Sequence, residues 1–115
     1  MALTNKDTHM IRHMVLIRFP ESCPADTVAS IFDQFAQLQS VVPGMLNFQF
    51  GTDITPVSLS QGFTHGLTID FKDVASRDGY WAHPGHLAIA EKLAPLLDKG
   101  REDILIFQFP FAATH

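Results

Sequence analysis

The segment from Tyr80 to His86, with the sequence YWAHPGH, carries the side chains best suited to proton-transfer chemistry. Pro84 disfavours helix in the residue before it and fits the first turn of a helix that begins there. The segment therefore predicts a helix start, with His86 in the first turn. Because the positive end of the helix dipole disfavours further positive charge, we expect the pKa of His86 to be lowered. A neutral imidazole in that place can accept a proton or bind a metal ion.

The rest of the chain predicts the elements that hold this segment in place. Alternating apolar residues indicate four strands, at Met10–Phe19, Met45–Gly51, Phe63–Phe71 and Asp103–Phe109. Apolar residues at helical spacing predict a helix over about 24–40 and a second helical region in two parts. The first part is a short helix from its cap Asp73 through Trp81, and the second begins at the histidine segment and fades between Pro95 and Gly100. This β-α-β-β-α-β order is typical of an α+β ferredoxin-like sandwich, with helices on one face of an antiparallel sheet.

The spacing also predicts which side chains share a face. The first helix buries the stripe Val28, Ile31, Phe32, Phe35 and Leu38. One face of the first strand carries Ile11, His13, Val15, Ile17 and Phe19. In the second strand the expected apolar face is Leu46, Phe48 and Phe50, with Asn47 and Gln49 opposite.

The topology brings several chemically useful residues to one end of the sandwich. The first and third strands are antiparallel neighbours in this fold, so His13 lies at the end where the third strand finishes. The chain leaves the third strand there and reaches Tyr80 and His86, while the late turns of the first helix bring Phe35 to the same end. We expect these four residues to line one mouth between the sheet and the helices. His65 starts the third strand at the opposite end, and a structural role is expected for it.

The sheet face away from the helices is more apolar than a solvated face should be. Met14, Leu16 and one face of the last strand, with Leu105, Phe107 and Phe109, would be exposed there. Each such side chain is worth roughly 1.5–3 kcal/mol when buried. A second copy packed face to face would bury them and form a homodimeric α/β barrel. The alternative is that the two tails fold over the sheet, but both tails are short and mostly small or polar.

Composition limits the remaining classes of function. A chain of 115 residues is one domain, 1–115, with a core over about 10–110. The net charge is -4, and the charged residues are scattered along the chain without forming a basic stripe. This distribution argues against nucleic acid as a partner. Cys23 is the single cysteine, so no intramolecular disulfide forms. The N-terminus has no signal-like apolar run, and no segment approaches membrane-spanning length. The expectation is a cytoplasmic protein without a membrane partner.

Four segments in order resemble the stress-responsive A/B barrel (Dabb) domain family. They are HMVLIRF from His13, Val42-Pro43-Gly44, FTHG from Phe63, and the segment from Tyr80 to His86. The resemblance spans about residues 11–109 and implies a dimeric barrel of ferredoxin-like halves. Most members have no assigned reaction, but one plant member closes a linear polyketide without a cofactor. Its two catalytic histidines match His13 and His86, and a pocket tyrosine matches Tyr80. Phe35 stands where that enzyme has a second pocket tyrosine, so one hydroxyl is lost.

Two hypotheses of function follow. The first is a cofactor-independent lyase, cyclase or isomerase acting on a small aromatic or polyketide-like ligand. His86 would be the general base, and His13 would orient it or stabilise a developing enolate. Tyr80 would donate a hydrogen bond to a substrate oxygen, with Phe35 and His83 as further substrate-binding residues. The second hypothesis is a non-catalytic stress-associated protein that binds a ligand or serves as a scaffold. A cofactor-independent monooxygenase is a more distant alternative.

The same residues can also be interpreted as structural. His13 and His86 would then be core histidines bonded to the backbone, Tyr80 a buried aromatic residue, and His83 a helix cap. No metal is expected, because His83 and His86 lack a nearby Cys or carboxylate to complete a zinc site. No cofactor is expected either, since the chain has no phosphate-binding glycine loop. An open mouth with His13 and His86 within hydrogen-bond reach, directly or through one water, would favour the enzyme, and a packed mouth would favour the non-catalytic protein.

Overall fold

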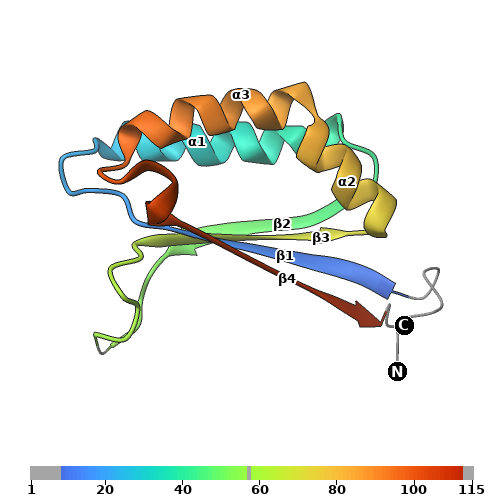
Figure 1. The fold of residues 1–115 in the computed structure, drawn as a ribbon, viewed down its shortest axis with the longest axis horizontal. Coiled ribbons are helices and arrows are strands. Elements are labelled where there is room, and N and C mark those ends of the chain that lie inside the picture. The colour runs from blue at the N-terminus through green and yellow to red at the C-terminus, as the bar shows by residue number, and fades with distance from the viewer. Residues whose placement is uncertain (1–8, 57, 113–115) are drawn as a thin grey trace.

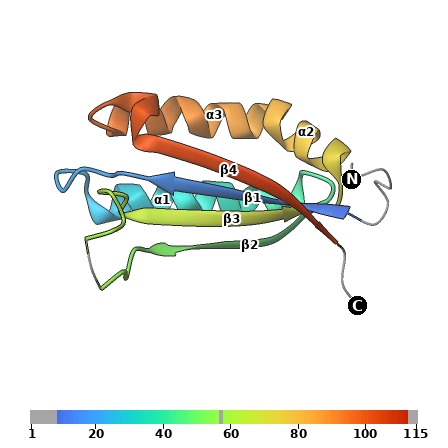
Figure 2. The ribbon, with the colours of Figure 1, turned by 60° about the horizontal axis from the view of Figure 1, so that its bottom comes forward.

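A four-stranded antiparallel sheet forms one layer of the molecule. The computed structural model describes residues 9–56 and 58–112, and the tails considered as a cover for the sheet lie outside them. The strands are β1 (His9–Ile17), β2 (Met45–Thr52), β3 (His65–Phe71) and β4 (Ile104–Ala112). Their order in the sheet is β2-β3-β1-β4, so β1 and β3 are central (Figure 2). Every neighbouring pair is antiparallel, as the sequence predicted.

The second layer consists of helices on one face of this sheet (Figure 1). They are α1 (Ala25–Gln37), α2 (Val74–Ala82) and α3 (Pro84–Leu93). Short 3-10 turns follow α1 at Leu38–Ser40 and α3 at Ala94–Leu96, and a third at Gly100–Asp103 precedes β4. The predicted ferredoxin-like β-α-β-β-α-β order, with its second helical region split in two, is confirmed.

Local caps explain where the two later helices begin. The carboxylate of Asp73 accepts a hydrogen bond from the Ser76 amide at 2.8 Å and so caps α2. The ring of His83 accepts one from the Gly85 amide at 2.9 Å and so caps α3, with Pro84 in the first turn. Both helix starts therefore lie where the sequence placed them.

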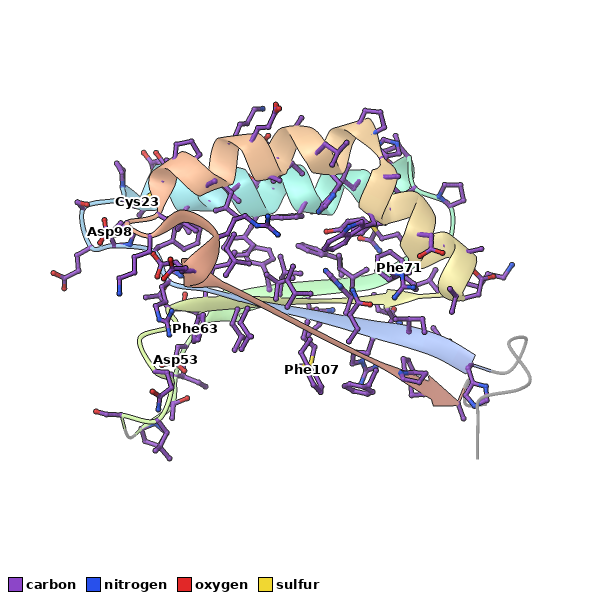
Figure 3. All side chains as sticks on the ribbon, viewed as in Figure 1. Cys23, Asp53, Phe63, Phe71, Asp98 and Phe107 are labelled. Atoms are coloured by element: carbon purple, nitrogen blue, oxygen red, sulfur yellow. The ribbon has the colours of Figure 1, made fainter. Side chains whose placement is uncertain are left out.

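The core lies between the helices and the inner face of the sheet. Ile11, His13, Val15 and Ile17 are buried on that face of β1, and the predicted stripe of α1 packs over them. Phe32 occupies the centre of an aromatic cluster: its ring stacks on Phe50 at 4.8 Å between centroids. Phe71 points to this side of the sheet, whereas Phe107 lies on the other (Figure 3).

The predicted faces of β2 were wrong. Leu46 pairs with Asp70, on the open face, whereas Phe50 pairs with Leu67, on the inner face. Between Leu46 and Gln49 a β-bulge adds one residue, and Asn47 there has a left-handed φ of 47°. An extra residue turns every later side chain to the other face, which simple alternation does not foresee.

The open face of the sheet is apolar along β1 and β4. Register pairs its residues as Met10 with Phe111, Met14 with Phe107, and Leu16 with Leu105. Phe107 is 61% exposed, and Leu105 and Phe109 are exposed as well. One charged pair interrupts this face: Arg12 donates to both carboxylate oxygens of Asp70, at 2.8 and 3.0 Å.

Replacing Phe32 by Ala should destabilise the fold by roughly 3–5 kcal/mol, because it leaves a cavity where an aromatic side chain is 1% exposed. Ile54→Ala is the matched control, since that side chain is 92% exposed, and its effect should stay within about 0.5 kcal/mol. Urea unfolding followed by tryptophan fluorescence gives both values. Equal losses in the two variants would contradict this description of the core.

Candidate functional site

A pocket of about 860 Å³ opens between α3 and the half of the sheet formed by β1 and β4. The structure brings four of the predicted site residues into its lining: His13, Phe35, Tyr80 and His86. Trp81 and Leu87 add to the rim, and both are exposed. The mouth is therefore open and lined by both histidines, although among residues 9–56 and 58–112 no direct hydrogen bond joins His13 to His86.

His13 reaches the pocket from the middle of β1 and is 1% exposed. Its Nδ1 lies 2.8 Å from the side-chain nitrogen of Gln108, which faces it across the β1–β4 register. Its ring makes an edge contact with Tyr80, at 5.5 Å between centroids. The pKa of His13 is lowered to about 4, first because the ring is buried and then because His86 and Arg77 lie nearby. His13 is therefore neutral at pH 7.

His86 lies in the first turn of α3, on the other side of Tyr80. Its Nδ1 is 3.1 Å from the backbone carbonyl of Trp81, which has no donor of its own. Nδ1 therefore carries the hydrogen and donates it, and Nε2 keeps a lone pair. The pKa of His86 is lowered, first by burial, although the bond to Trp81 opposes the shift. The predicted direction is correct, but the main cause is burial and not the helix dipole that the sequence suggested.

The ring of Tyr80 contacts the rings of both histidines. Its ring centroid lies 4.5 Å from that of His86 and 5.5 Å from that of His13. The residue is 1% exposed, and burial raises the pKa of its hydroxyl above the usual range, so it stays protonated. Among residues 9–56 and 58–112, no hydrogen-bond partner is found for this hydroxyl. Every fully buried side-chain oxygen in these residues has a partner, so the hydroxyl oxygen is not fully buried. The hydroxyl therefore keeps access to the pocket as a donor.

His83 and His65 lie elsewhere. His83, predicted as a substrate-binding residue, lines a separate hollow of about 440 Å³ between α1 and α3, and its Nδ1 is used in capping. A Cβ at Gly85 would come within 2.7 Å of the end of the Leu38 side chain and 3.1 Å of the His83 ring, so a larger residue there would have to displace Leu38. His65 stacks near Phe32 at the far end of the sheet, in agreement with the structural role expected for it.

Two residues near His13 were missed by sequence reasoning. Gln108 is the partner of its Nδ1, and the Arg77 guanidinium lies 2.6 Å from the amide oxygen of Gln108. A signal was available: Gln108 is a polar residue on the face of β4 that also carries Ile104 and Ile106. The amide on this otherwise apolar face indicates a polar partner inside, but only the register of β4 against β1 identifies that partner as His13.

The described residues offer no resident metal site. Over residues 9–56 and 58–112, no three His, Cys, Asp or Glu side chains gather closely enough to hold a metal ion. In the same part of the chain no helix has the length and apolar character needed to cross a membrane. The polar side chains that line the pocket include the imidazoles of His13 and His86 and the phenol of Tyr80. Glu91 and Arg101 also line it.

The fold and this pocket define a ferredoxin-like α+β protein with a histidine- and tyrosine-lined cavity beneath its last helix. The chain belongs to the stress responsive A/B barrel domain (Dabb) family, whose sequence pattern matches residues 11–111. The family membership inferred from the four sequence segments is thereby confirmed.

Several proteins with names or solved structures are similar to this chain. Olivetolic acid cyclase of Cannabis sativa is 22% identical over 99 residues, which cover 86% of this chain and 94% of that protein. The structure of hydroxynitrile lyase from Passiflora edulis superposes with a TM-score of 0.77 at 25% identity and covers 92% of this chain and 96% of that one. A dimeric ferredoxin-like protein of unknown function from Jannaschia sp. CCS1 gives 0.79 at 23%, covering 87% and 97%.

The burial of His13 predicts a loss of stability in mild acid. Its pKa is about 4 in the folded state and 6.5 when unfolded, so the unfolded chain gains the proton first as the pH falls. Stability is therefore full above pH 6.5 and declines from there to about pH 4. Between pH 7 and pH 5 His13 should account for about 2 kcal/mol of lost unfolding free energy.

Urea unfolding of the wild type and of His13→Gln at both pH values measures this contribution. The variant should lose less stability between pH 7 and pH 5 than the wild type does. Equal pH dependence in the two proteins would show that His13 titrates normally.

Proposed function

We propose that this protein is a cofactor-independent enzyme of the lyase, cyclase or isomerase type, acting on a small aromatic or polyketide-like molecule in the pocket. The observation that carries the proposal is the contact of His86 Nδ1 with the Trp81 carbonyl, which leaves a lone pair on Nε2, in a cavity also lined by Tyr80. A base and a donor in one apolar cavity are the requirements for moving a proton on a carbonyl compound.

His86 would act as the general base. Its Nε2 accepts a proton from a carbon next to a carbonyl, and the electron pair of the broken C–H bond forms an enolate with its charge on the carbonyl oxygen. With a hydroxynitrile, Nε2 instead accepts the hydroxyl proton, the O–H electron pair forms the C=O bond, and the C–CN bond breaks with its electron pair on cyanide. In both cases negative charge develops on the substrate oxygen during the step. Tyr80 donates a hydrogen bond to that oxygen, where negative charge develops, and His13 is the second polar group within the same space. The proton held on His86 then passes to another atom of the enolate, or to the departing cyanide. The balance of this sequence needs no oxidant or external reductant.

The rest of the lining suits an aromatic substrate. Phe35, Val15, Leu93 and Ile106 supply apolar walls, and the Trp81 ring lies 5.2 Å from that of His86. Such walls exclude water, which strengthens hydrogen bonds to a developing charge. Two proteins similar to this chain are named as a cyclase and a lyase, which supports the reaction class without identifying the substrate.

We also propose that the protein is a homodimer joined through the open face of the sheet. The apolar residues on β1 and β4 would be costly to leave in water, and a similar protein of this fold is described as dimeric. The face is continuous across the two strands, so a second copy could cover it and close an α/β barrel.

Replacing His86 by Gln tests the enzyme. The amide of Gln can still donate to the Trp81 carbonyl but cannot act as a base, so turnover should fall roughly 100- to 10,000-fold. The probes are mandelonitrile, an aromatic hydroxynitrile assayed by aldehyde release, and olivetolic acid, assayed as a ligand by thermal shift. We expect the wild type to turn over mandelonitrile and to bind olivetolic acid, and we expect His86→Gln to lose the turnover.

His65→Gln is the matched control, because that histidine lies at the other end of the sheet, and it should respond as the wild type does. Equal responses in the wild type and His86→Gln would contradict the proposal. Binding of a probe that His86→Gln abolishes, with no turnover of either compound, would favour the non-catalytic ligand-binding hypothesis.

Replacing Phe107 by Asp tests the dimer. Because this side chain is already exposed in the single chain, its change should leave the fold intact while placing a charge in the interface. Light scattering after gel filtration should give twice the 12.8 kDa chain mass for the wild type and the single mass for the variant. Ile54→Asp, in an exposed loop, should remain dimeric. A monomeric wild type at micromolar concentration would refute the interface.

A further inference from the structure

We propose that Arg77 and Gln108 are positioning residues that hold His13 in one tautomer, with its hydrogen on Nε2 facing the pocket. Two roles of His13 are compatible with its place in the pocket, to orient the base or to stabilise a developing enolate. The hydrogen bonds behind His13 decide between these roles, and none of the residues behind it reaches the pocket.

Arg77, a residue of α2, sets the orientation of the Gln108 amide. Arg77 Nη1 lies 2.6 Å from Gln108 Oε1, and a guanidinium group has donors but no acceptor. The opposite orientation of the amide would set two donors against each other. The guanidinium is itself held by Asp78, which accepts from Arg77 Nε at 2.8 Å. The amide oxygen therefore faces Arg77, and the amide nitrogen faces His13.

The tautomer of His13 follows from that orientation. An amide nitrogen only donates, and it lies 2.8 Å from His13 Nδ1, so Nδ1 must accept and cannot carry a hydrogen. The hydrogen of the neutral ring is then on Nε2. A doubly protonated ring would place two donors face to face at this buried position, which agrees with the lowered pKa of His13.

The free edge of the ring meets the pocket. Over residues 9–56 and 58–112, His13 Nε2 has no hydrogen-bond partner, and His13 is among the residues that line the cavity. Because no fully buried side-chain nitrogen in these residues lacks a partner, the unpartnered Nε2 is accessible, and its N–H faces the pocket. His86 has the reverse arrangement, with its hydrogen on Nδ1 and its lone pair on Nε2. The two histidines thus present one donor and one acceptor, and His13 and Tyr80 together form a pair of donors for one substrate oxygen.

The tautomer is a property of the folded chain alone, whereas its use on a substrate oxygen rests on the proposed function. Long-range ¹H–¹⁵N correlation spectra of ¹⁵N-histidine-labelled protein at pH 7 distinguish the two nitrogens of each ring. We expect His13 to show the hydrogen on Nε2 and His86 to show it on Nδ1. A hydrogen on Nδ1 of wild-type His13 would overturn the proposal.

Two variants and one control identify the cause. Gln108→Glu is nearly isosteric but presents an acceptor, so His13 should move its hydrogen to Nδ1, and its pKa should rise. Arg77→Met frees the Gln108 amide, and the spectrum should change from one tautomer to a mixture. Arg101→Met removes an arginine at the edge of the pocket, away from Gln108, and should leave the spectrum unchanged. An unaltered tautomer in both Gln108→Glu and Arg77→Met would overturn the proposal, because a merely structural role would not move these signals.

Turnover of mandelonitrile separates this inference from the proposed function. If His13 donates to the substrate oxygen, Gln108→Glu should lower kcat roughly 100-fold, as the loss of one oxyanion donor does. Full activity with the tautomer inverted would overturn the donor role of His13. The expected tautomers in a protein that turns over neither probe would support the positioning of His13 and count against the enzyme.

Discussion

The pairing of β1 with β4 is the constraint on which the site depends. β1 is a central strand, and successive residues of a strand point to opposite faces, so a buried His13 requires Arg12 and Met14 on the open face. The register then sets Gln108 opposite His13 and Phe107 opposite Met14. One alignment of two strands thereby supplies a polar partner for the buried imidazole on one face and an apolar surface on the other.

Burial determines which polar atoms of the pocket are hydrogen-bonded within the protein and which remain available to a ligand. A buried imidazole is costly unless its nitrogens are bonded or reach a solvated space, and each of the two rings here satisfies one nitrogen within the protein and leaves the other for the cavity. For His86 the internal partner is a carbonyl at the end of α2, a group that the helix itself cannot satisfy. The break between α2 and α3 therefore both creates an acceptor and sets the histidine five residues later against it.

The sequence was sufficient for the element order, the sheet topology and the grouping of His13, Phe35, Tyr80 and His86, because these depend on periodicity, helix starts and strand adjacency. It was insufficient where one residue departs from a period. The bulge at Asn47 turned Leu46 and Phe50 to opposite faces, and nothing in the alternation marked it. The contact of Gln108 with His13 depended on a register between strands far apart in the chain. The contact of Arg77 with Gln108 was hidden for the same reason, because it forms only once α2 has packed on the sheet.

The same register explains why a donor, and not a hydrophobic residue, lies behind His13. β4 alternates Phe107, Gln108 and Phe109, so a shift of one residue against β1 would place a phenylalanine beside the imidazole and send the amide to the open face. Such a shift would bury the phenylalanines inward, leave Nδ1 of His13 without a partner and separate Arg77 from Gln108. Three independent terms therefore favour the observed alignment: the hydrogen bond to His13, the hydrogen bond to Arg77, and the continuity of the apolar face. The contacts that select this register are also those that direct the free edge of His13 into the pocket.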